Sequence, residues 1–297
     1  MTVDGRSVLI TGGGGQLASD LEERLRERCQ VSAPSRSELD ITDQAALDEA
    51  LDWVEPAVVF NCAAFHNVEV CEREEDRAFE VNARAAKRLA QRCAGADAGL
   101  VHLSTNYVFA GDREEPYVEA DLPSPRSVYA ISKLAGEHAA LAYCPRAIVV
   151  RASGLYGHHG SASKGGNFVQ RMIERAREHG TLKMVADQRL SPTYTADLAD
   201  GIVAAVDEDV SGLLHMGNSG SCSWYEFTLA IMEIAGLDVP VEPVQTVRPA
   251  GGADRPLNGV LASERSTEAG LASLRPWRAA LEDYMASAGL AAEASVR

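Results

Sequence analysis

The sequence predicts a doubly wound α/β fold, in which a parallel sheet carries helices on both faces and a smaller mixed part follows toward the C-terminus. Three observations support this prediction. Short apolar runs typical of buried parallel strands alternate with helical patterns. Four consecutive glycines join the first apolar run to the first helical pattern. After Arg151 the composition changes, and residues 154–167 are rich in Gly, Ser and His.

The order of the expected elements supports a parallel sheet. After the first strand at Ser7–Ile10, apolar strand candidates lie at 31–33, 57–61, 99–104 and 147–151, and helical patterns lie between them at 43–53, 74–95 and 129–142. This βαβα order places helices on both sides of a parallel sheet. Beyond Arg151 we expect a helix over 168–178, a strand over 182–185, a helix over 195–206 and a mixed remainder with a helix opened by Ser223.

These elements divide the chain into two expected domains. The first comprises residues 1–152, to which residues 183–208 return, and the second comprises residues 153–182 and 209–297. A chain of 297 residues is long enough to bury a sizeable core in one large domain or two moderate ones. No internal repeat interrupts this organisation.

Composition and charge narrow the classes of protein. The chain is 46% apolar and 24% charged, as in soluble globular proteins, and its net charge of −15 disfavours nucleic acids and anionic membrane surfaces as partners. Its six cysteines contain no Cys-x-x-Cys pair, which favours buried thiols in a reducing cytoplasm over a disulfide framework or a metal site. No apolar stretch has the length of a membrane span, and the first strand begins too soon after Met1 for a signal peptide.

The glycine run has the context of a dinucleotide-binding fingerprint. It follows a strand and precedes a helix, where glycines allow a tight turn and let the backbone approach a pyrophosphate at the positive end of the helix. Two spacings fit, one from Gly12 to Gly15 and Ala18, the other from Gly13 to the same two residues. Spacing alone does not choose between them.

Tyr129 and Lys133 form the most informative pair in the chain. Lys133 is one of only four lysines, and it follows the tyrosine by four residues in an expected helix, so that both side chains lie on one face. A nearby ammonium favours the phenolate and lowers a tyrosine pKa, which suits proton transfer near neutral pH. The alternative on local sequence is an exposed tyrosine beside an exposed lysine.

The segment after the second strand indicates the cofactor preference. Folds that favour NAD place an acidic residue near the end of this strand to bind the ribose 2′-hydroxyl. Here Ser35 and Arg36 stand at that place, and the first acid is Glu38. A hydroxyl and a guanidinium suit a 2′-phosphate, so we predict NADP(H) rather than NAD(H).

An ordered set of motifs runs along nearly the whole chain. It includes Gly12-x-x-Gly15-Gln16-Leu17, Ser104-Thr105-Asn106-Tyr107, Tyr129-x-x-Ser132-Lys133, Asn167-Phe168-Val169, Asp187-Gln188, Ser191-Pro192-Thr193, Arg255-Pro256 and Pro276-Trp277. This set resembles the dTDP-4-dehydrorhamnose reductase branch of the extended short-chain dehydrogenase/reductase family, and the resemblance implies a Rossmann-type fold.

The resemblance implies an NADP-dependent oxidoreductase that reduces the 4-keto group of a dTDP-4-keto-6-deoxyhexose. Thr105 would bind the keto oxygen, Tyr129 would protonate it, and Lys133 would hold the nicotinamide ribose. The other implied cofactor contacts are Gly12, Gly15, Gln16, Leu17, Ser35, Arg36, Asp40, Ile41, Cys62, Ala63 and Ala64. The implied substrate contacts are Val68, Thr105, Asn106, Asn167, Gln188 and Arg255, although Asn167 suits a helix cap equally well. The sequence does not decide whether the protein forms a homodimer.

Four positions depart from the family pattern. Asn106 stands where Asp is usual, Gly154 where Trp is usual, Ala130 where Gly is usual and Gly259 where Ser is usual. Asn106 and Gly154 border the expected sugar pocket. We expect Gly154 to remove an apolar wall and loosen the backbone there, unless another side chain fills the space. The sequence therefore does not decide which keto sugar is reduced.

Two other functions fit the fold. A nucleotide-sugar dehydratase or epimerase of this kind would hold NAD, and a dehydratase carries Asp-Glu after the threonine, where this chain has Asn106-Tyr107. A non-catalytic NADP-binding regulatory subunit would keep the fold, but the intact Thr105, Tyr129 and Lys133 argue against it.

Overall fold

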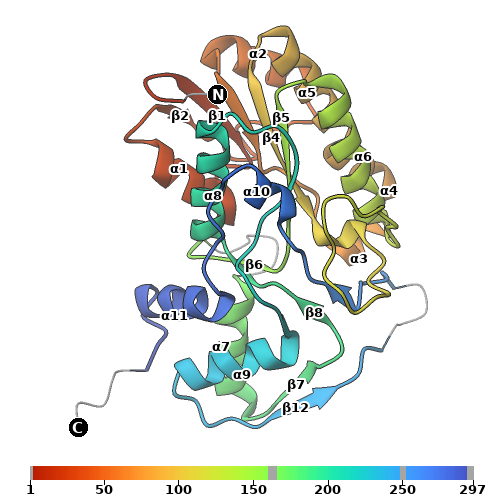
Figure 1. Cartoon of the computed structure of the whole chain (residues 1–297), viewed down its shortest axis with the longest axis vertical. Coiled ribbons are helices and arrows are strands. Elements are labelled where there is room, and N and C mark those ends of the chain that lie inside the picture. Colours follow the sequence, from red (N-terminus) through yellow and green to blue (C-terminus); the bar gives the residue numbers. More distant parts are fainter. Residues whose placement is uncertain (1–2, 160–165, 248–251, 293–297) are drawn as a thin grey trace.

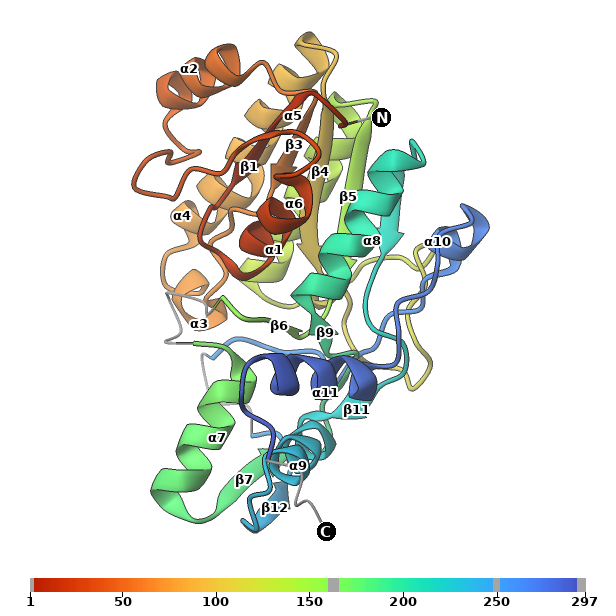
Figure 2. The ribbon, with the colours of Figure 1, turned by 90° about the vertical axis from the view of Figure 1, so that its left-hand side faces the viewer.

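The structure, a computed structural model, describes residues 3–159, 166–247 and 252–292. Two lobes lie one above the other (Figure 1). The large lobe contains the central sheet and the N-terminal half of the chain. The small lobe contains helices α7 (Phe168–His179), α9 (Trp224–Ile234) and α11 (Trp277–Ser287). In the side view the chain passes between the lobes several times (Figure 2).

A six-stranded, fully parallel sheet forms the centre of the large lobe. Its order is β10-β5-β4-β3-β1-β2, and every neighbouring pair is parallel. The strands are β1 (Ser7–Thr11), β2 (Gln30–Ser32), β3 (Val58–Asn61), β4 (Gly99–Thr105), β5 (Ala147–Ala152) and β10 (Gly212–His215). The predicted doubly wound α/β fold with a smaller mixed part is confirmed.

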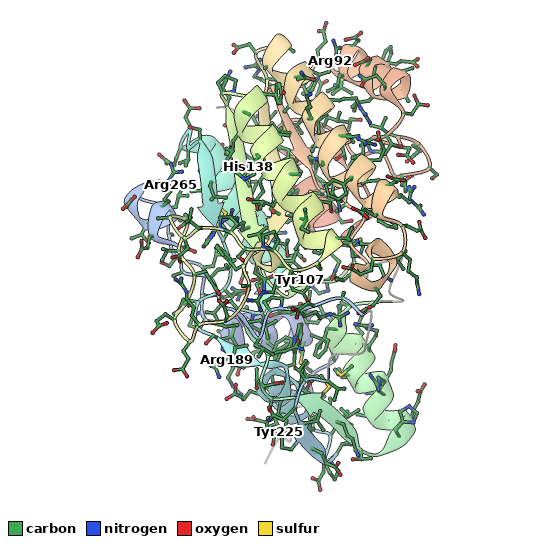
Figure 3. The ribbon with its side chains drawn as sticks, turned by 90° about the vertical axis from the view of Figure 1, so that its right-hand side faces the viewer. Arg92, Tyr107, His138, Arg189, Tyr225 and Arg265 are labelled. Carbon is green, nitrogen blue, oxygen red and sulfur yellow. The ribbon has the colours of Figure 1, made fainter. Side chains whose placement is uncertain are left out.

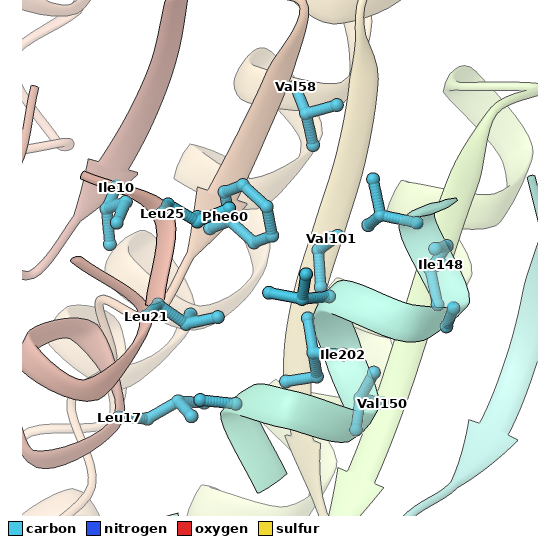
Figure 4. Close-up of a cluster of buried hydrophobic side chains, with 14 of the residues drawn as sticks. Ile10, Leu17, Leu21, Leu25, Val58, Phe60, Val101, Ile148, Val150 and Ile202 are labelled. Atoms are coloured by element: carbon cyan, nitrogen blue, oxygen red, sulfur yellow. The ribbon is translucent and has the colours of Figure 1, made fainter. Parts of the chain in front are cut away.

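Alternation along the strands supplies a core on each face of the sheet. Val8, Ile10 and Phe60 point to one face, where they meet α1 (Gln16–Leu25) and α8 (Thr195–Asp207) (Figure 4). Leu9 and Val59 point to the other, which is covered by α2 (Gln44–Val54), α5 (Ala86–Gly95) and α6 (Val128–Tyr143). These strand residues are fully buried, so both faces of the sheet are hydrophobic, as parallel sheets require.

The glycine run follows β1, the strand at which the order of the sheet changes direction. β2 lies on one side of β1, and β3 lies on the other. Gly12 has a φ of +76°, and a Cβ there would lie 2.9 Å from the backbone nitrogen of Ala63. Gly13 donates its N–H to the Pro34 carbonyl at 3.0 Å, and a Cβ there would lie 2.0 Å from the Ala33 carbonyl oxygen. The turn therefore touches the ends of both neighbouring strands, and in open α/β sheets this switch point is where ligands bind.

The predicted helix over 74–95 contains an irregularity. It is divided into α4 (Glu75–Phe79), a π-helical turn (η1, Glu80–Ala85) and α5. Asn82 lies in this turn, and its side chain accepts from Phe65 N at 2.8 Å and donates to Phe65 O at 3.0 Å. A π turn carries an extra residue within one helical turn. Here the π turn places the buried Asn82 side chain against the loop after β3.

The small lobe has its own core. Buried residues of α7, α9 and α11 pack around aromatic side chains that include Tyr156, Phe227 and Tyr284. Short strand pairs complete it, formed by β7 (Leu182–Val185) with β12 (Val241–Val244), and by β8 (Arg189–Leu190) with β11 (Cys222–Ser223) and β13 (Asn258–Gly259). The pair β6 (Leu155–Tyr156) and β9 (Thr193–Tyr194) lies where the lobes meet.

Two segments lie in a different lobe from the one to which the predicted domain boundaries assign them. β7, at the start of the segment 183–208, pairs with β12 in the small lobe rather than joining the large one. β10, within the segment 209–297, is the edge strand of the central sheet, where its residues pair with Ile148 to Arg151 of β5. A four-residue apolar strand leaves no periodicity long enough to assign it to one sheet or the other.

No helix in the part of the chain that the structure describes is long and apolar enough to cross a membrane. The longest helix in the sheet lobe, α6, has 16 residues and includes the buried polar residues Ser132, Lys133 and Glu137.

The glycine turn yields a prediction of stability. Gly13→Ala should destabilise the protein by about 1–3 kcal/mol, the usual cost of an overpacked site, because the added methyl group would collide with the backbone carbonyl of Ala33. Urea denaturation followed by circular dichroism measures the change. Gly95→Ala is the matched control, since that helical glycine has nothing within 4 Å of a Cβ; equal stability changes in the two variants would contradict the packing argument.

Candidate active site

The carboxyl ends of β1, β3 and β4 and the first turns of α6 bring the predicted catalytic residues together. Thr105 is the last residue of β4, and Tyr129 and Lys133 lie in the first two turns of α6. Ser127 caps this helix by accepting from the N–H of Ala130 at 3.2 Å. Tyr107, in the short helix η2 (Asn106–Val108), lies where the two lobes meet (Figure 3).

Tyr129 lies against Thr105 and Tyr107. The Thr105 hydroxyl neighbours its phenol, and its ring meets Tyr107 edge-on with centroids 5.9 Å apart. Burial raises the pKa of Tyr129 above its ordinary value, and the Thr105 hydroxyl, which lowers it, only partly offsets this. The expected lowering by Lys133 is therefore wrong for this structure, because burial dominates, and Tyr129 is a neutral phenol at pH 7.

Lys133 is buried, 2% exposed, and its ammonium donates to the Leu103 carbonyl at 2.6 Å. Burial lowers its pKa to about 8, while Glu137 and then Cys62 act in the opposite direction. The side chain is consequently still mostly protonated at neutral pH. An ammonium has three donors, so those not used by Leu103 can serve a ligand.

A chain of polar side chains crosses the sheet beneath this site. The Thr11 hydroxyl donates to Asn61 Oδ1 at 2.8 Å, and Asn61 Nδ2 lies 3.0 Å from His102 Nδ1. Burial lowers the pKa of His102 well below its ordinary value, with Lys133 adding to the effect, so the imidazole is neutral and its Nδ1 accepts from Asn61. The three strands β1, β3 and β4 are thereby joined at their carboxyl ends.

The start of α1 offers a site for a phosphate group. Gly15 occupies the N-cap without a side-chain cap, and the first turn holds no acidic residue. The first N–H groups of the helix are thus available to an anion. Gln16 and Leu17 open the helix, and Gln16 Oε1 is buried with no hydrogen-bond partner among the described residues. Gly12 and Gly13 both lie close to neighbouring backbone, and Gly15 starts the helix, so the structure is compatible with both of the predicted spacings.

Ser35 and Arg36 follow β2 beside this helix end. Arg36 is 62% exposed and pairs with Asp40 at 3.3 Å. Burial acts against ionisation of Asp40, but hydrogen bonds from the Thr42 N–H and hydroxyl and from Arg36 lower its pKa overall. Asp40 therefore holds a turn that precedes α2, with the predicted contact residue Ile41 buried inside it. The Arg36 guanidinium is accessible to a ligand.

Of the predicted contacts after β3, Ala63 lies directly against the glycine turn. Cys62, Ala63 and Ala64 are partly buried, and Ala63 touches Gly12 as described above. Burial raises the pKa of Cys62 to about 12, so its thiol is neutral. Val68 opens α3 (Val68–Cys71) at the end of the same loop.

The sequence did not single out Asn82, whose side chain is hydrogen-bonded to this loop. Asn82 is 1% exposed and donates to the Ser132 hydroxyl at 2.9 Å, in addition to its two bonds with Phe65. It therefore ties the loop after β3 to the catalytic helix α6. Its signal in the sequence is a single polar residue on the buried face of an otherwise regular helical pattern.

The predicted substrate residues lie apart in two groups. Arg255 pairs with Glu69 of α3 at 2.9 Å and also acts on the Tyr107 phenol, whose pKa it lowers against the effect of burial. The Tyr107 ring in turn meets the Tyr129 ring edge-on, so Tyr107 is the neighbour that Arg255 and Tyr129 share. Gln188 is further down in the small lobe, where its amide donates to the Thr246 hydroxyl at 2.9 Å.

Asn167 acts as a helix cap. It is 2% exposed, accepts from the N–H of Gln170 at 2.9 Å, and donates to Gly157 O and to the Tyr284 hydroxyl. All of its polar atoms are engaged within the protein. Contact with a substrate would require these bonds to break, so the capping alternative explains its position better.

Two departures from the family pattern fit one another. A Cβ on Gly259 would lie 2.0 Å from the amide nitrogen of Asn106, so the carboxamide occupies the space that a larger residue at 259 would need. Asn106 is buried, and its Oδ1 lies 3.4 Å from the Thr105 hydroxyl.

The departure at residue 154 leaves no gap. Gly154 has a φ of +58°, and a Cβ there would lie 2.5 Å from Leu190 Cδ1. Leu190 is 4% exposed and fills the space. This contact agrees with the alternative that another side chain fills the space, and the expected change in the sugar pocket stays a prediction.

The Lys133 environment predicts a pH-dependent stability. Its pKa is about 8 when folded against an ordinary 10.5, so between these values the unfolded chain binds more protons and stability rises with pH. Lys133→Met removes this cost. We expect the variant to be the more stable near pH 7, and its advantage to shrink by at most about 1.4 kcal/mol per pH unit from pH 8 upward.

Urea denaturation of both proteins across pH 7 to 10 measures this difference. Lys183→Met is the control, because that lysine is 69% exposed and pairs only loosely with Glu242. A constant difference between wild type and Lys133→Met would show that the buried ammonium does not titrate in this range.

Comparisons with known proteins agree with this site. Residues 6–289 match the family model described as the RmlD substrate binding domain. The chain is 40% identical to a dTDP-4-dehydrorhamnose reductase from Mycolicibacterium smegmatis, over 97% of this chain and 87% of the relative. It is 38% identical to a dTDP-4-keto-6-deoxy-D-glucose reductase from Streptomyces niveus, over 92% and 94% of the two chains.

A solved structure has the same fold. The crystal structure of dTDP-4-dehydrorhamnose reductase from Bacillus anthracis in complex with NADP superposes with a TM-score of 0.90 at 35% identity, covering 95% of this chain and 99% of that one. Family model, sequence relatives and structure all extend over nearly the full length. The chain belongs to the RmlD substrate binding domain family, the dTDP-4-dehydrorhamnose reductase branch that its motifs indicate.

Proposed function

We propose that this protein reduces the 4-keto group of a dTDP-4-keto-6-deoxyhexose with NADPH, in the biosynthesis of a deoxysugar. The observation that carries the proposal is the convergence of Thr105, Tyr129 and Lys133 at the carboxyl edge of the parallel sheet, the edge at which the uncapped start of α1 also lies. Relatives named as reductases of two such keto sugars, and the NADP complex of a structural relative, support it.

The residues around the glycine turn fit NADPH. Gly12 and Gly13 allow close approach of a backbone, the first N–H groups of α1 suit a pyrophosphate, and Arg36 suits a 2′-phosphate. Lys133, with donors to spare, would hold ribose hydroxyls. When bound, NADPH supplies the hydride that is added to the carbonyl carbon.

Tyr129 is suited to act as the acid. A phenol is protonated at neutral pH, and burial raises the pKa of Tyr129 further, so Tyr129 can donate a proton to the keto oxygen as that oxygen becomes an alkoxide. The Thr105 hydroxyl beside it would hydrogen-bond the same oxygen and fix its position. After the proton transfer, the Lys133 ammonium would stabilise the negatively charged Tyr129 phenolate.

The substrate's diphosphate would bind Arg255. In this structure Arg255 is neutralised by Glu69, and a diphosphate offers a stronger partner than a carboxylate that is 43% exposed. The buried, fully engaged Asn167 is a poor substrate contact by comparison.

The alternative reactions fit less well. A dehydratase needs an acid and a base beside the threonine, where η2 places Asn106 and Tyr107, the latter with a pKa raised by burial. A regulatory subunit would not need the Thr105 hydroxyl and the Tyr129 phenol to lie next to each other.

The cytoplasmic location and the homodimer remain predictions. The six free cysteines are as expected for a protein in a reducing compartment. Light scattering after gel filtration tests whether the protein is a dimer.

Tyr129→Phe should lower kcat for ketone reduction by roughly 10²–10⁴-fold, the usual contribution of one acid catalyst. NADPH affinity should be largely kept, because Lys133 and the glycine turn are unchanged. Oxidation of NADPH in the presence of dTDP-4-keto-6-deoxyhexoses, followed at 340 nm, measures the rate.

Tyr143→Phe is the matched control, since it makes the same change in the last turn of the same helix at a side chain that is largely accessible. Near-normal turnover by Tyr129→Phe would remove the acid from this mechanism.

Arg36→Ala should reduce the preference for NADPH over NADH by about tenfold. A charge-assisted hydrogen bond is worth about 1.5–3 kcal/mol, and the low end applies because Arg36 is largely exposed and already pairs with Asp40. The ratio of kcat/KM for the two cofactors measures the preference.

Arg84→Ala is a close control, because Arg84 is 63% exposed and pairs with Glu80 at 3.2 Å, again four residues apart. If the wild type uses NADH and NADPH equally well, Arg36 does not select the cofactor.

A further inference from the structure

A buried ion pair lies one helical turn beyond Lys133. Glu137 of α6 and Arg151 of β5 are each 2% exposed. The guanidinium donates to both carboxylate oxygens, with the shortest contact at 2.6 Å, and the Ser104 hydroxyl donates to Glu137 Oε1 at 2.5 Å. Desolvating two charges is costly unless their geometry is good, and here the carboxylate has three donors.

This pair continues a pattern that joins β4 to α6. Residues 103 and 104 of β4 are hydrogen-bonded to residues 133 and 137 of α6, one helical turn apart, and Thr105 neighbours Tyr129 one turn earlier. Residues four apart lie on one face of a helix. The Glu137 contacts therefore help to set the position along β4 at which Tyr129 and Lys133 stand.

Glu137 also supplies the negative charge near the buried ammonium. The titratable groups that act on Lys133 are Cys62 after β3, His102 on β4 and Glu137 on α6 itself. Burial keeps the Cys62 thiol and the His102 imidazole neutral. Of these three groups, Glu137 alone carries a charge that favours the ammonium.

We propose that Glu137 is a positioning residue of the reaction, whose carboxylate, fixed by Arg151 and Ser104, keeps Lys133 charged and holds α6 in register with β4. It touches neither the keto sugar nor the cofactor and acts through Lys133. The inference rests on the proposed function, in which the Lys133 ammonium binds the ribose of NADPH.

The test is the pH dependence of NADPH binding to the full chain, followed by cofactor fluorescence from pH 7 to 9.5, with Glu137→Gln against the wild type. Burial lowers the Lys133 pKa to about 8, so wild-type affinity should fall above that pH. Loss of the anion should move this fall to lower pH by about one unit. At pH 8.5 the Kd should then rise roughly five- to tenfold over wild type, and only about twofold at pH 7.

Arg151→Met is the matched control. It breaks the same ion pair and should cost comparable stability, but it leaves the Glu137 charge beside Lys133. The fall in affinity should then stay in place or move to higher pH. A shift to lower pH in both variants would show that damage to the packing causes it, and an unshifted fall in Glu137→Gln would overturn the proposal.

Loss of folding in Glu137→Gln would not end the test. The double variant Glu137→Met with Arg151→Met removes both charges, and buried pairs replaced by apolar side chains of similar volume often keep their stability. It lacks the anion, so it should show the same shift to lower pH. If the wild type binds NADPH without any change between pH 7 and 9.5, the role given to Lys133 is wrong, whatever the variants do.

Discussion

The ion pair of Glu137 and Arg151 is the constraint on which the site depends. It joins α6 to β5 through the centre of the large lobe, and Arg151 Nη1 also lies 3.5 Å from His215 on β10. Removing one partner of such a pair typically costs about 3–5 kcal/mol, because the other charge remains buried. The same contacts fix the catalytic helix, so the fold and the geometry of the site rest on one set of side chains.

Burial sets the protonation states of the two central residues. Withdrawal from water raises the pKa of Tyr129 and lowers that of Lys133, so each is pushed toward its neutral form. A neutral phenol is the form that donates a proton, whereas the lysine must stay charged. This difference explains why the phenol needs only a hydroxyl neighbour, while the ammonium needs a carboxylate nearby.

Much of this arrangement could be predicted from sequence. The apolar runs located the first five strands of the sheet, and the spacing of Tyr129 and Lys133 placed both on α6. Local patterns could not predict contacts between distant segments. Leu190 fills the space beside Gly154, and Asn106 lies over Gly259. The π turn at 80–85 was also missed, because the sequence there reads as one regular helix and the Asn82 contacts that accompany the extra residue involve a remote loop.

The return of β10 to the central sheet has a consequence for folding. A fragment ending at residue 152 would contain five strands but neither β10 nor α8. The edge of β5 would then lack its partner, and the apolar face that α8 covers would meet water. The large lobe therefore cannot complete its structure until the chain has passed through the small lobe and returned. We expect the two lobes to unfold in a single cooperative transition, and any closure around a ligand to be a small adjustment between parts that never separate.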